Sequence, residues 1–248
     1  MPDLFFSGMS NKIHLGDCLS VMATLPEHSV SAVVTDLPYG TTYAPWDSTI
    51  RLDRLWEAIK YVMVPGGAVV MTASQPFTSV LVMSNLRWFR CEWIWDKVNA
   101  ANFANAKRQP LKVHESVLIF CERQPYYKPE RVPGAVNHKQ GKSTRNVSET
   151  RLIHERVADD LSGLKYPKSI QIFPKHSSQC RLHSTQKPVD LLRYFIRVYT
   201  QPQDLILDPA CGSGSTCEAA RLEDRRYIGI DNDPKCVEIA TERVCQPR

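Results

Sequence analysis

Apolar residues along the chain form short runs that alternate with helical stripes. Runs rich in β-branched residues and bounded by turn formers predict buried strands; they lie at 12–15, 30–35, 68–72, 89–95, 116–120, 204–207 and 226–230. Apolar residues spaced three or four apart predict helices; they lie at 18–25, 52–62, 77–86, 188–199 and 234–244, with another after 216. Strands that alternate with helices predict an α/β fold whose largely parallel sheet is covered on both faces.

Two segments interrupt this alternation. Periodicity is lost from Lys97 to Val113 and again from Gln124 to Leu182, where paired tyrosines, prolines and interleaved bases leave one possible short helix near 150–161. About 60 irregular residues are long for a connection inside a domain. We therefore interpret 124–182 as an inserted recognition segment, and 1–123 with 183–248 as one domain.

Length and composition narrow the class of protein. A chain of 248 residues can bury a sizeable core and fits one large domain better than two. It has no 18-residue apolar run and no N-terminal signal peptide, so we expect a cytoplasmic protein without a membrane span. The eight cysteines include no C-x-x-C pair. Reduced thiols are therefore expected, and no metal site is predicted.

The net charge of +5 is unevenly distributed. The stretch 97–188 holds 17 Lys and Arg against 7 Asp and Glu, a net of +10, which leaves −5 for the rest of the chain. Such a stretch either faces an anionic partner or forms a solvated surface. Charge alone leaves both readings open.

The loop after the strand at 30–35 carries the first candidate chemistry, Asp36-Leu37-Pro38-Tyr39. Asp36 and the Leu37 carbonyl could each accept one hydrogen of an aromatic amine, while Tyr39 stacks on its ring and Pro38 limits the flexing of the loop. Asp and Pro are also ordinary turn residues. The motif alone does not decide between an amine site and a turn.

A glycine loop follows the strand at 204–207. It leads into a helix and then a strand that ends at Asp231, which is half of a nucleotide-binding fold. Gly212 and Gly214 allow close approach of a ligand, and Asp231 could hold both ribose hydroxyls. Position 217 is Cys rather than a third glycine, and Asp208 precedes the loop. A carboxylate there disfavours a pyrophosphate and suits the ammonium and sulfonium groups of S-adenosylmethionine.

Together these motifs resemble those of the amino-group DNA methyltransferases. The resemblance rests on Asp36-Leu37-Pro38-Tyr39, His183-Ser184-Thr185-Gln186-Lys187-Pro188, 208–216 and Gly229-Ile230-Asp231. Their order, with the target motif first and the cofactor motif last, resembles the beta class. It implies a Rossmann-like, circularly permuted methyltransferase sheet with an inserted target-recognition segment. Gly40-Thr41-Thr42 and Trp46-Asp47 look closest to short phage- and prophage-borne enzymes.

The resemblance also implies roles for residues. Asp36, Leu37, Pro38 and Tyr39 would form the catalytic motif. The residues implied to bind the cofactor are Asp17, which would hold its adenine as well as capping a helix, Thr185, Lys187, Asp208, Pro209, Ala210, Cys211, Gly212, Ser213, Gly214, Asp231 and Asn232. The residues implied to contact DNA are Lys107, Arg108, Lys112, Lys139, Lys142, Arg145 and Arg151. The chain departs from the family pattern at Leu37, Ser184 and Ala210, and the last of these removes a possible cofactor contact.

The implied activity is transfer of a methyl group from S-adenosylmethionine to the N6 amine of an adenine flipped out of double-stranded DNA. Cytosine-N4 methylation is the first alternative, although that group usually carries Ser-Pro-Pro-Tyr. A catalytically silent nucleic-acid-binding module is the second, from a different class. We expect a monomer or homodimer in the cytoplasm of a bacterial or phage-infected cell.

Overall fold

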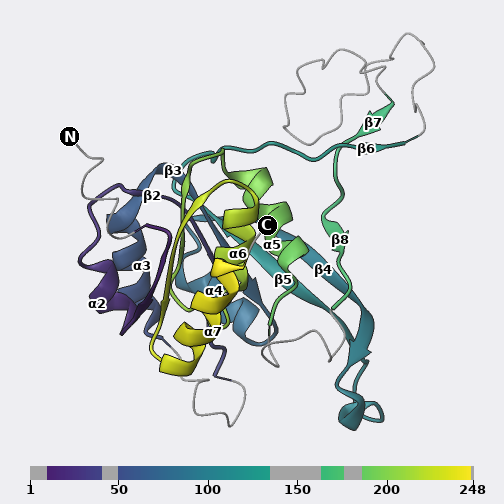
Figure 1. The fold of residues 1–248 in the computed structure, drawn as a ribbon. Coiled ribbons are helices and arrows are strands. Elements are labelled where there is room, and N and C mark those ends of the chain that lie inside the picture. The colour runs from purple at the N-terminus through teal and green to yellow at the C-terminus, as the bar shows by residue number, and fades with distance from the viewer. Residues whose placement is uncertain (1–9, 41–49, 135–162, 176–185, 247–248) are drawn as a thin grey trace. The chain divides into compact units, whose positions relative to one another are not determined.

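The computed structural model describes residues 10–40, 50–134, 163–175 and 186–246. Its centre is an eight-stranded sheet (Figure 1). The strands follow the order β1 (Lys12–Leu15), β10 (Arg226–Asp231), β9 (Leu205–Asp208), β2 (Val30–Thr35), β3 (Met63–Ala73), β5 (Lys112–Phe120), β4 (Phe89–Ala101) and β8 (Ile170–Ile172). Every neighbouring pair is parallel except those that β5 makes with β3 and β4. The predicted α/β fold with a largely parallel sheet is therefore confirmed.

Helices cover both faces of the sheet. One face packs against α2 (Cys18–Met22), α3 (Leu52–Val62) and α4 (Phe77–Ser84), and the other against α5 (Val189–Tyr199), α6 (Ser215–Leu222) and α7 (Pro234–Cys245). Successive residues of a strand alternate between these cores: Val33 lies in the first and Val34 in the second. This two-sided burial explains why the central strands are apolar without alternation. No helix in the described part of the chain is long and apolar enough to cross a membrane.

Strand β3 begins earlier than its apolar run predicts. It starts at Met63, directly after α3, so Pro65, Gly66 and Gly67 lie inside the strand and do not form a turn between helix and strand. The pairing of β2 with β3 shifts register between Val30 and Ala32. Irregular pairing of this kind tolerates proline and glycine, which a regular central strand excludes.

The first irregular segment, 97–113, is mostly a β-hairpin, which corrects the prediction. Strand β4 continues to Ala101, β5 begins at Lys112, and a short 3-10 turn, η1 (Phe103–Asn105), lies between them. In Figure 1 the hairpin extends to the lower right beyond the other strands. Because most of its outer part is exposed on both faces, it lacks the apolar alternation from which strands are predicted.

The second irregular segment divides differently from the prediction. Contacts separate the chain into one unit of residues 1–128 with 169–248 and a second unit of 129–168. The second unit contains a small antiparallel pair, β6 (Val132–Pro133) and β7 (Leu164–Lys165). Strand β8 falls within the predicted insertion, 124–182, yet it pairs with β4 of the main sheet. The possible helix near 150–161 lies outside the described residues.

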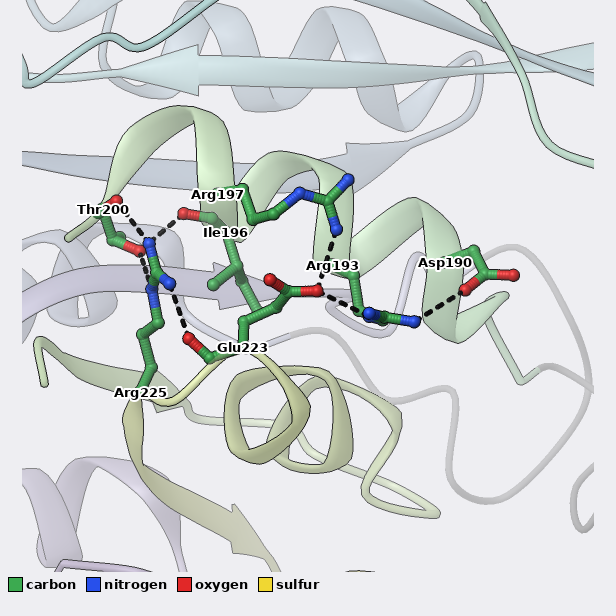
Figure 2. Close-up of polar contacts among 7 residues, drawn as sticks. All are labelled: Asp190, Arg193, Ile196, Arg197, Thr200, Glu223 and Arg225. Carbon is green, nitrogen blue, oxygen red and sulfur yellow. Dashed lines mark hydrogen bonds and ion pairs between the residues drawn. The ribbon is translucent and has the colours of Figure 1, made fainter. Parts of the chain in front are cut away.

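A cluster of arginines joins α5 to the loop after α6 (Figure 2). Glu223 Oε1 accepts hydrogen bonds from Arg193 at 2.6 Å and Arg197 at 2.8 Å. Arg225 donates to the carbonyl oxygens of Glu223 at 2.5 Å and Thr200 at 2.7 Å. These contacts fix the end of α5 against the segment that leads into β10.

Candidate active site

Four aspartates gather at one edge of the sheet. Asp36 follows β2, Asp208 ends β9, Asp231 ends β10, and Asp17 comes two residues after β1. These four strands are parallel neighbours, so their carboxyl ends meet at the same edge. Between β9 and β2 the covering helices change face, α6 following β9 on one side and α3 following β2 on the other. Such a switch point opens a crevice that ligands occupy in α/β sheets.

A cavity of about 400 Å³ lies at this edge. Most of the predicted site residues that the structure describes line it: Asp17, Asp36, Leu37, Pro38, Tyr39, Lys187, Asp208, Pro209, Ala210, Cys211, Gly212, Ser213, Asp231 and Asn232. The target motif and the cofactor motif, about 170 residues apart in the sequence, therefore share one cavity. The lining residues that sequence reasoning missed include Cys18, Ile50, Glu115, Lys175, Gln186, Leu192, Ser215, Thr216, Asp233 and Cys236.

Asp36 is the centre of a polar cluster. Its Oδ1 accepts hydrogen bonds from the hydroxyls of Tyr39, at 2.7 Å, and Thr72. Its Oδ2 accepts from Lys187 Nζ at 2.5 Å. Thr72 lies on β3 and was not predicted, since no local motif marks it. The carboxylate is therefore held on both oxygens while it faces the cavity.

Tyr39 is held by its ring as well as by its hydroxyl. The ring stacks on Phe77 with centroids 5.0 Å apart and planes 22° apart. Lys187 Nζ lies over the ring, 5.7 Å from its centroid. Burial, and next the charge of Asp36, raise the pKa of Tyr39 well above its ordinary value, so its hydroxyl stays protonated and donates to Asp36.

Glu115 and Lys97 extend the cluster into the hairpin. Glu115 Oε1 accepts from Lys97 Nζ at 3.0 Å, and Glu115 Oε2 lies 3.4 Å from Lys187 Nζ. Burial opposes a low pKa for Glu115, but Lys187 and Lys97 bring it below the ordinary value. Burial likewise opposes the charge of Lys187. Its pKa is nevertheless raised well above the usual range by the carboxylates of Asp36 and Glu115. Glu115 and Lys187 are therefore both charged at neutral pH.

The two glycines of the predicted cofactor loop, Gly212 and Gly214, have different structural roles. Gly212 has φ +49°, lines the cavity, and a Cβ added there would meet no atom within 4 Å. Gly214 has φ +78° and does not line the cavity; its Cβ would lie 2.8 Å from the Cβ of Ala240 on α7. Gly212 thus leaves room for a ligand, whereas Gly214 lets α6 and α7 pack closely.

Asp231 and Asp17 both order the loops that surround the cavity. Asp231 Oδ2 accepts from the Gly212 amide at 2.8 Å, and its Oδ1 from the Asp233 amide at 2.9 Å. Asp17 caps α2, as predicted, through Oδ1, which accepts from the amide and hydroxyl of Ser20. A carboxylate has about four acceptor positions. Both side chains thus retain acceptor capacity toward the cavity.

Asp208 is only 3% exposed. Burial raises its pKa to about 6, although contacts with Thr216, Thr35 and the Ala210 amide act in the opposite direction. An ionised carboxylate at this position would be stabilised by a cation in the cavity. Acidic side chains around an open glycine loop fit S-adenosylmethionine, whose reactive end carries ammonium and sulfonium groups.

Two cysteines of the site are protonated packing residues. Burial, followed by the charge of Asp17, raises the pKa of Cys18 to about 11. The pKa of Cys211 is also raised well above its ordinary value, by its contact with Cys217 and by burial. Neither thiol is activated as a nucleophile. Among the described residues, no group of three or more His, Cys, Asp or Glu is placed to hold a metal ion.

Several predicted residues are not part of the cavity. Lys107 and Arg108 are exposed between β4 and β5, and Lys112 starts β5. Thr185, Lys139, Lys142, Arg145 and Arg151 lie outside the described residues, as do Thr41, Thr42, Trp46 and Asp47 of the phage-like pattern.

Comparisons with known proteins agree with this geometry. A model of the family described as DNA methylase, for N6 and N4 methylation, matches residues 30–242. The type II methyltransferase M.HinfI of Haemophilus influenzae is 27% identical, over 94% of this chain and 68% of its own length. M.BglII of Bacillus subtilis is 26% identical, over 97% of this chain and 70% of its own length.

Solved structures share the fold. The complex of M1.HpyAVI with S-adenosylmethionine superimposes with a TM-score of 0.66 at 20% identity, covering 95% of this chain and 99% of the other. The cytosine-N4-specific PvuII DNA methyltransferase also gives a TM-score of 0.66, at 16% identity, covering 95% of this chain and 86% of the other.

Proposed function

The chain belongs to the N6/N4 family of DNA methylases, which use S-adenosylmethionine, and from this premise we propose that it methylates the N6 amine of adenine in double-stranded DNA. The observation that carries the proposal is the position of Asp36. Its carboxylate faces a cavity that it shares with the glycine loop around Gly212. An amine acceptor and a cofactor loop in one cavity allow direct transfer between two bound substrates.

The residues of the cavity divide into two groups. Gly212, Asp231, Asp17 and Asp208 would hold S-adenosylmethionine, with Asp208 facing its positive charges. When bound, this cofactor supplies a methyl group on a sulfonium sulfur that an amine lone pair can attack. The target motif from Asp36 to Tyr39 would hold the base.

Asp36 makes the target amine a better nucleophile. The lone pair of an exocyclic amine is conjugated with its ring and attacks poorly. Acceptance of one amine hydrogen by Asp36 and of the other by the Leu37 carbonyl favours a tetrahedral nitrogen, whose lone pair is available. Holding both substrates in line contributes up to ~7–11 kcal/mol in favourable cases. No covalent nucleophile is needed, which agrees with the protonated state of Cys18 and Cys211.

Adenine is favoured over cytosine because position 36 is an aspartate. Cytosine-N4 enzymes usually carry Ser-Pro-Pro-Tyr in this motif, and a carboxylate is a stronger acceptor than a hydroxyl. The likeness to the cytosine-N4-specific PvuII enzyme is one of fold at 16% identity and does not favour cytosine.

DNA would approach over the basic middle of the chain. We propose that 124–182 supplies target recognition, as its length and charge suggest, and that the hairpin of β4 and β5 adds phosphate contacts through Lys107, Arg108 and Lys112. We propose that the protein acts in the cytoplasm of a bacterial cell, because its curated relatives M.HinfI and M.BglII come from bacteria.

Nucleoside analysis tests the proposal. Unmethylated genomic DNA is incubated with the protein and S-adenosylmethionine, digested to nucleosides and analysed by mass spectrometry. We expect N6-methyl-2′-deoxyadenosine among the products. Detection of N4-methyldeoxycytidine would instead identify cytosine as the target. Absence of both methylated nucleosides would favour the catalytically silent nucleic-acid-binding module.

The variant Asp36→Ala tests whether the Asp36 carboxylate is needed for methyl transfer. Loss of the amine acceptor should lower the transfer rate by about 10²- to 10³-fold or more. Affinity for S-adenosylmethionine, measured by calorimetry, should change little because the cofactor loop belongs to other strands. Near-normal turnover by this variant would refute the proposed mechanism.

A further inference from the structure

The two groups proposed to hold the target base are already in contact with a lysine. Lys187 Nζ lies 2.5 Å from Asp36 Oδ2 and over the ring of Tyr39, 5.7 Å from its centroid. Its side chain is only 10% exposed. A protonated amine therefore contacts both the acceptor and the aromatic surface that an incoming amino base requires.

A second carboxylate lies next to the same lysine. Glu115 Oε2 is buried, lies 3.4 Å from Lys187 Nζ, and accepts no hydrogen bond from any residue that the structure describes. The other oxygen of Glu115 is paired with Lys97. A buried acceptor without a donor is destabilising. Lys187 thus lies between one carboxylate oxygen that it satisfies and another that it could satisfy after a small movement.

Building on the proposed function, we propose that Lys187 holds the place of the target amine in the empty enzyme and moves from Asp36 to Glu115 when the base enters. The exchange leaves each of the two carboxylates with at least one hydrogen-bond donor. Without a base, the ammonium group neutralises Asp36; with a base, the amine hydrogens take its place and Lys187 satisfies Glu115 Oε2. Glu115 is then a positioning residue that acts on the base through Lys187.

The flexible stem of lysine suits this movement, because an ammonium is a compact charge on rotatable bonds. The charge on Lys187 persists in either position, since carboxylates on both sides raise its pKa despite burial.

A structural experiment tests the movement without DNA. In crystals of Asp36→Asn, the charge that holds Lys187 is gone, and we expect its Nζ to lie within about 2.7–3.2 Å of Glu115 Oε2. Thr72→Val is the matched control, because it removes an uncharged partner of Asp36 and should leave Lys187 in place. The proposal would be overturned if Lys187 Nζ still contacted the side chain of residue 36 in Asp36→Asn and Glu115 Oε2 remained without a donor.

A kinetic experiment tests the consequence for the base. Glu115→Gln should lower kcat/KM for DNA about tenfold, because Lys187 loses its second site. Adding Lys187→Met to that variant should restore activity about threefold or more, since no cation then competes for Asp36. A structural ion pair predicts the opposite, a double variant no more active than Glu115→Gln, and that result would overturn the proposal.

The two experiments separate this inference from the proposed function. If the parent protein methylates no DNA, the proposed function fails, and the position of Lys187 in Asp36→Asn still decides whether the exchange occurs. Melting curves accompany each variant because Glu115→Gln also weakens the pairing of Lys97. Should that variant not fold, the crystal structures of Asp36→Asn and Thr72→Val give the decision.

Discussion

Asp208 makes the stability of the empty protein depend on pH. Its pKa is raised from 3.8 to about 6 by burial, so the folded protein binds more protons than the unfolded chain between these values. The stability that the protonated form provides is complete below the lower value and is lost as the pH rises through about 6. We expect Asp208→Asn to gain about 2–3 kcal/mol over the parent at pH 7 and little at about pH 4.

Urea unfolding of both proteins between these pH values measures the difference. A difference that stays constant across the range would show that Asp208 is not the titrating group.

Two glycine substitutions separate packing from ligand access. Gly214→Ala adds a methyl 2.8 Å from the Cβ of Ala240 and 2.9 Å from its Cα, at a left-handed φ of +78°. Gly212→Ala also has a positive φ, but its methyl meets no atom within 4 Å. We expect Gly214→Ala to lose about 3 kcal/mol or more and Gly212→Ala about 1–2 kcal/mol. Equal losses in chemical denaturation would contradict the assignment of Gly214 to packing.

Site residues that belong to a continuous sequence motif could be predicted. Site residues that reach the site only because their strands pair in the sheet could not. Asp36 and Asp231 are recognisable because turn formers or glycines stand close to them in the sequence. Glu115 lines the same cavity from strand β5, and Thr72 donates a hydrogen bond to Asp36 from strand β3. Their sequence neighbours carry no sign of either contact. Lys97 could have been suspected, since a charge that continues an apolar strand requires a partner when buried.

At the scale of elements, Glu223 tests how α5 is attached to the segment after α6. Its side chain is 10% exposed and accepts from Arg193 and Arg197, which are each 36% exposed (Figure 2). We expect Glu223→Gln to cost about 1–2 kcal/mol, because two guanidinium groups lose a shared charged acceptor. Glu57→Gln, in the exposed pair with Arg54 on α3, is the control and should cost less than about 0.5 kcal/mol. Equal costs in urea unfolding would mean that the cluster of Figure 2 contributes no more than a surface pair.

Elements were predicted where one pattern of burial applied along their whole length. Strand β2 was found within its predicted bounds because both of its faces are covered. The outer hairpin of β4 and β5 was not predicted, since exposed strands need no apolar residues. Strand β8 was missed for a related reason: Ile170 and Ile172 are exposed, and three residues at a sheet edge give too short a pattern.

For the whole molecule, the order of motifs in the sequence differs from their order in space. The target motif comes early and the cofactor motif late, yet β2 and β9 are adjacent in the sheet. Alternation of strands and helices predicts such a sheet but not which strands become neighbours. The resemblance implied a methyltransferase sheet without giving the strand order, and the solved methyltransferase structures share the fold.

The uneven charge of the molecule predicts that its affinity for DNA depends on salt. Each phosphate that the protein neutralises contributes about −0.9 to the slope of log affinity against log salt. If Lys107 and Arg108 on the hairpin contact DNA, replacing both by Gln should reduce the slope by about two units. Replacing Lys139, Lys142 and Arg145 by Gln should reduce it by about one to three.

Fluorescence anisotropy with a duplex at several salt concentrations measures these slopes. Arg54→Gln with Lys60→Gln, on α3, is the control for loss of charge alone, and its slope should match that of the parent. Affinity for S-adenosylmethionine should not change in the hairpin variant or in the control, because the residues replaced in them do not line the cavity of about 400 Å³ at the carboxyl ends of the strands. We expect the same of the triple variant. An unchanged slope in the triple variant, with a reduced slope in the hairpin variant, would move the main DNA contact from the segment 124–182 to the hairpin. Unchanged slopes in both would mean that the positive charge of 97–188 forms a solvated surface, and DNA would then have to be held by other residues.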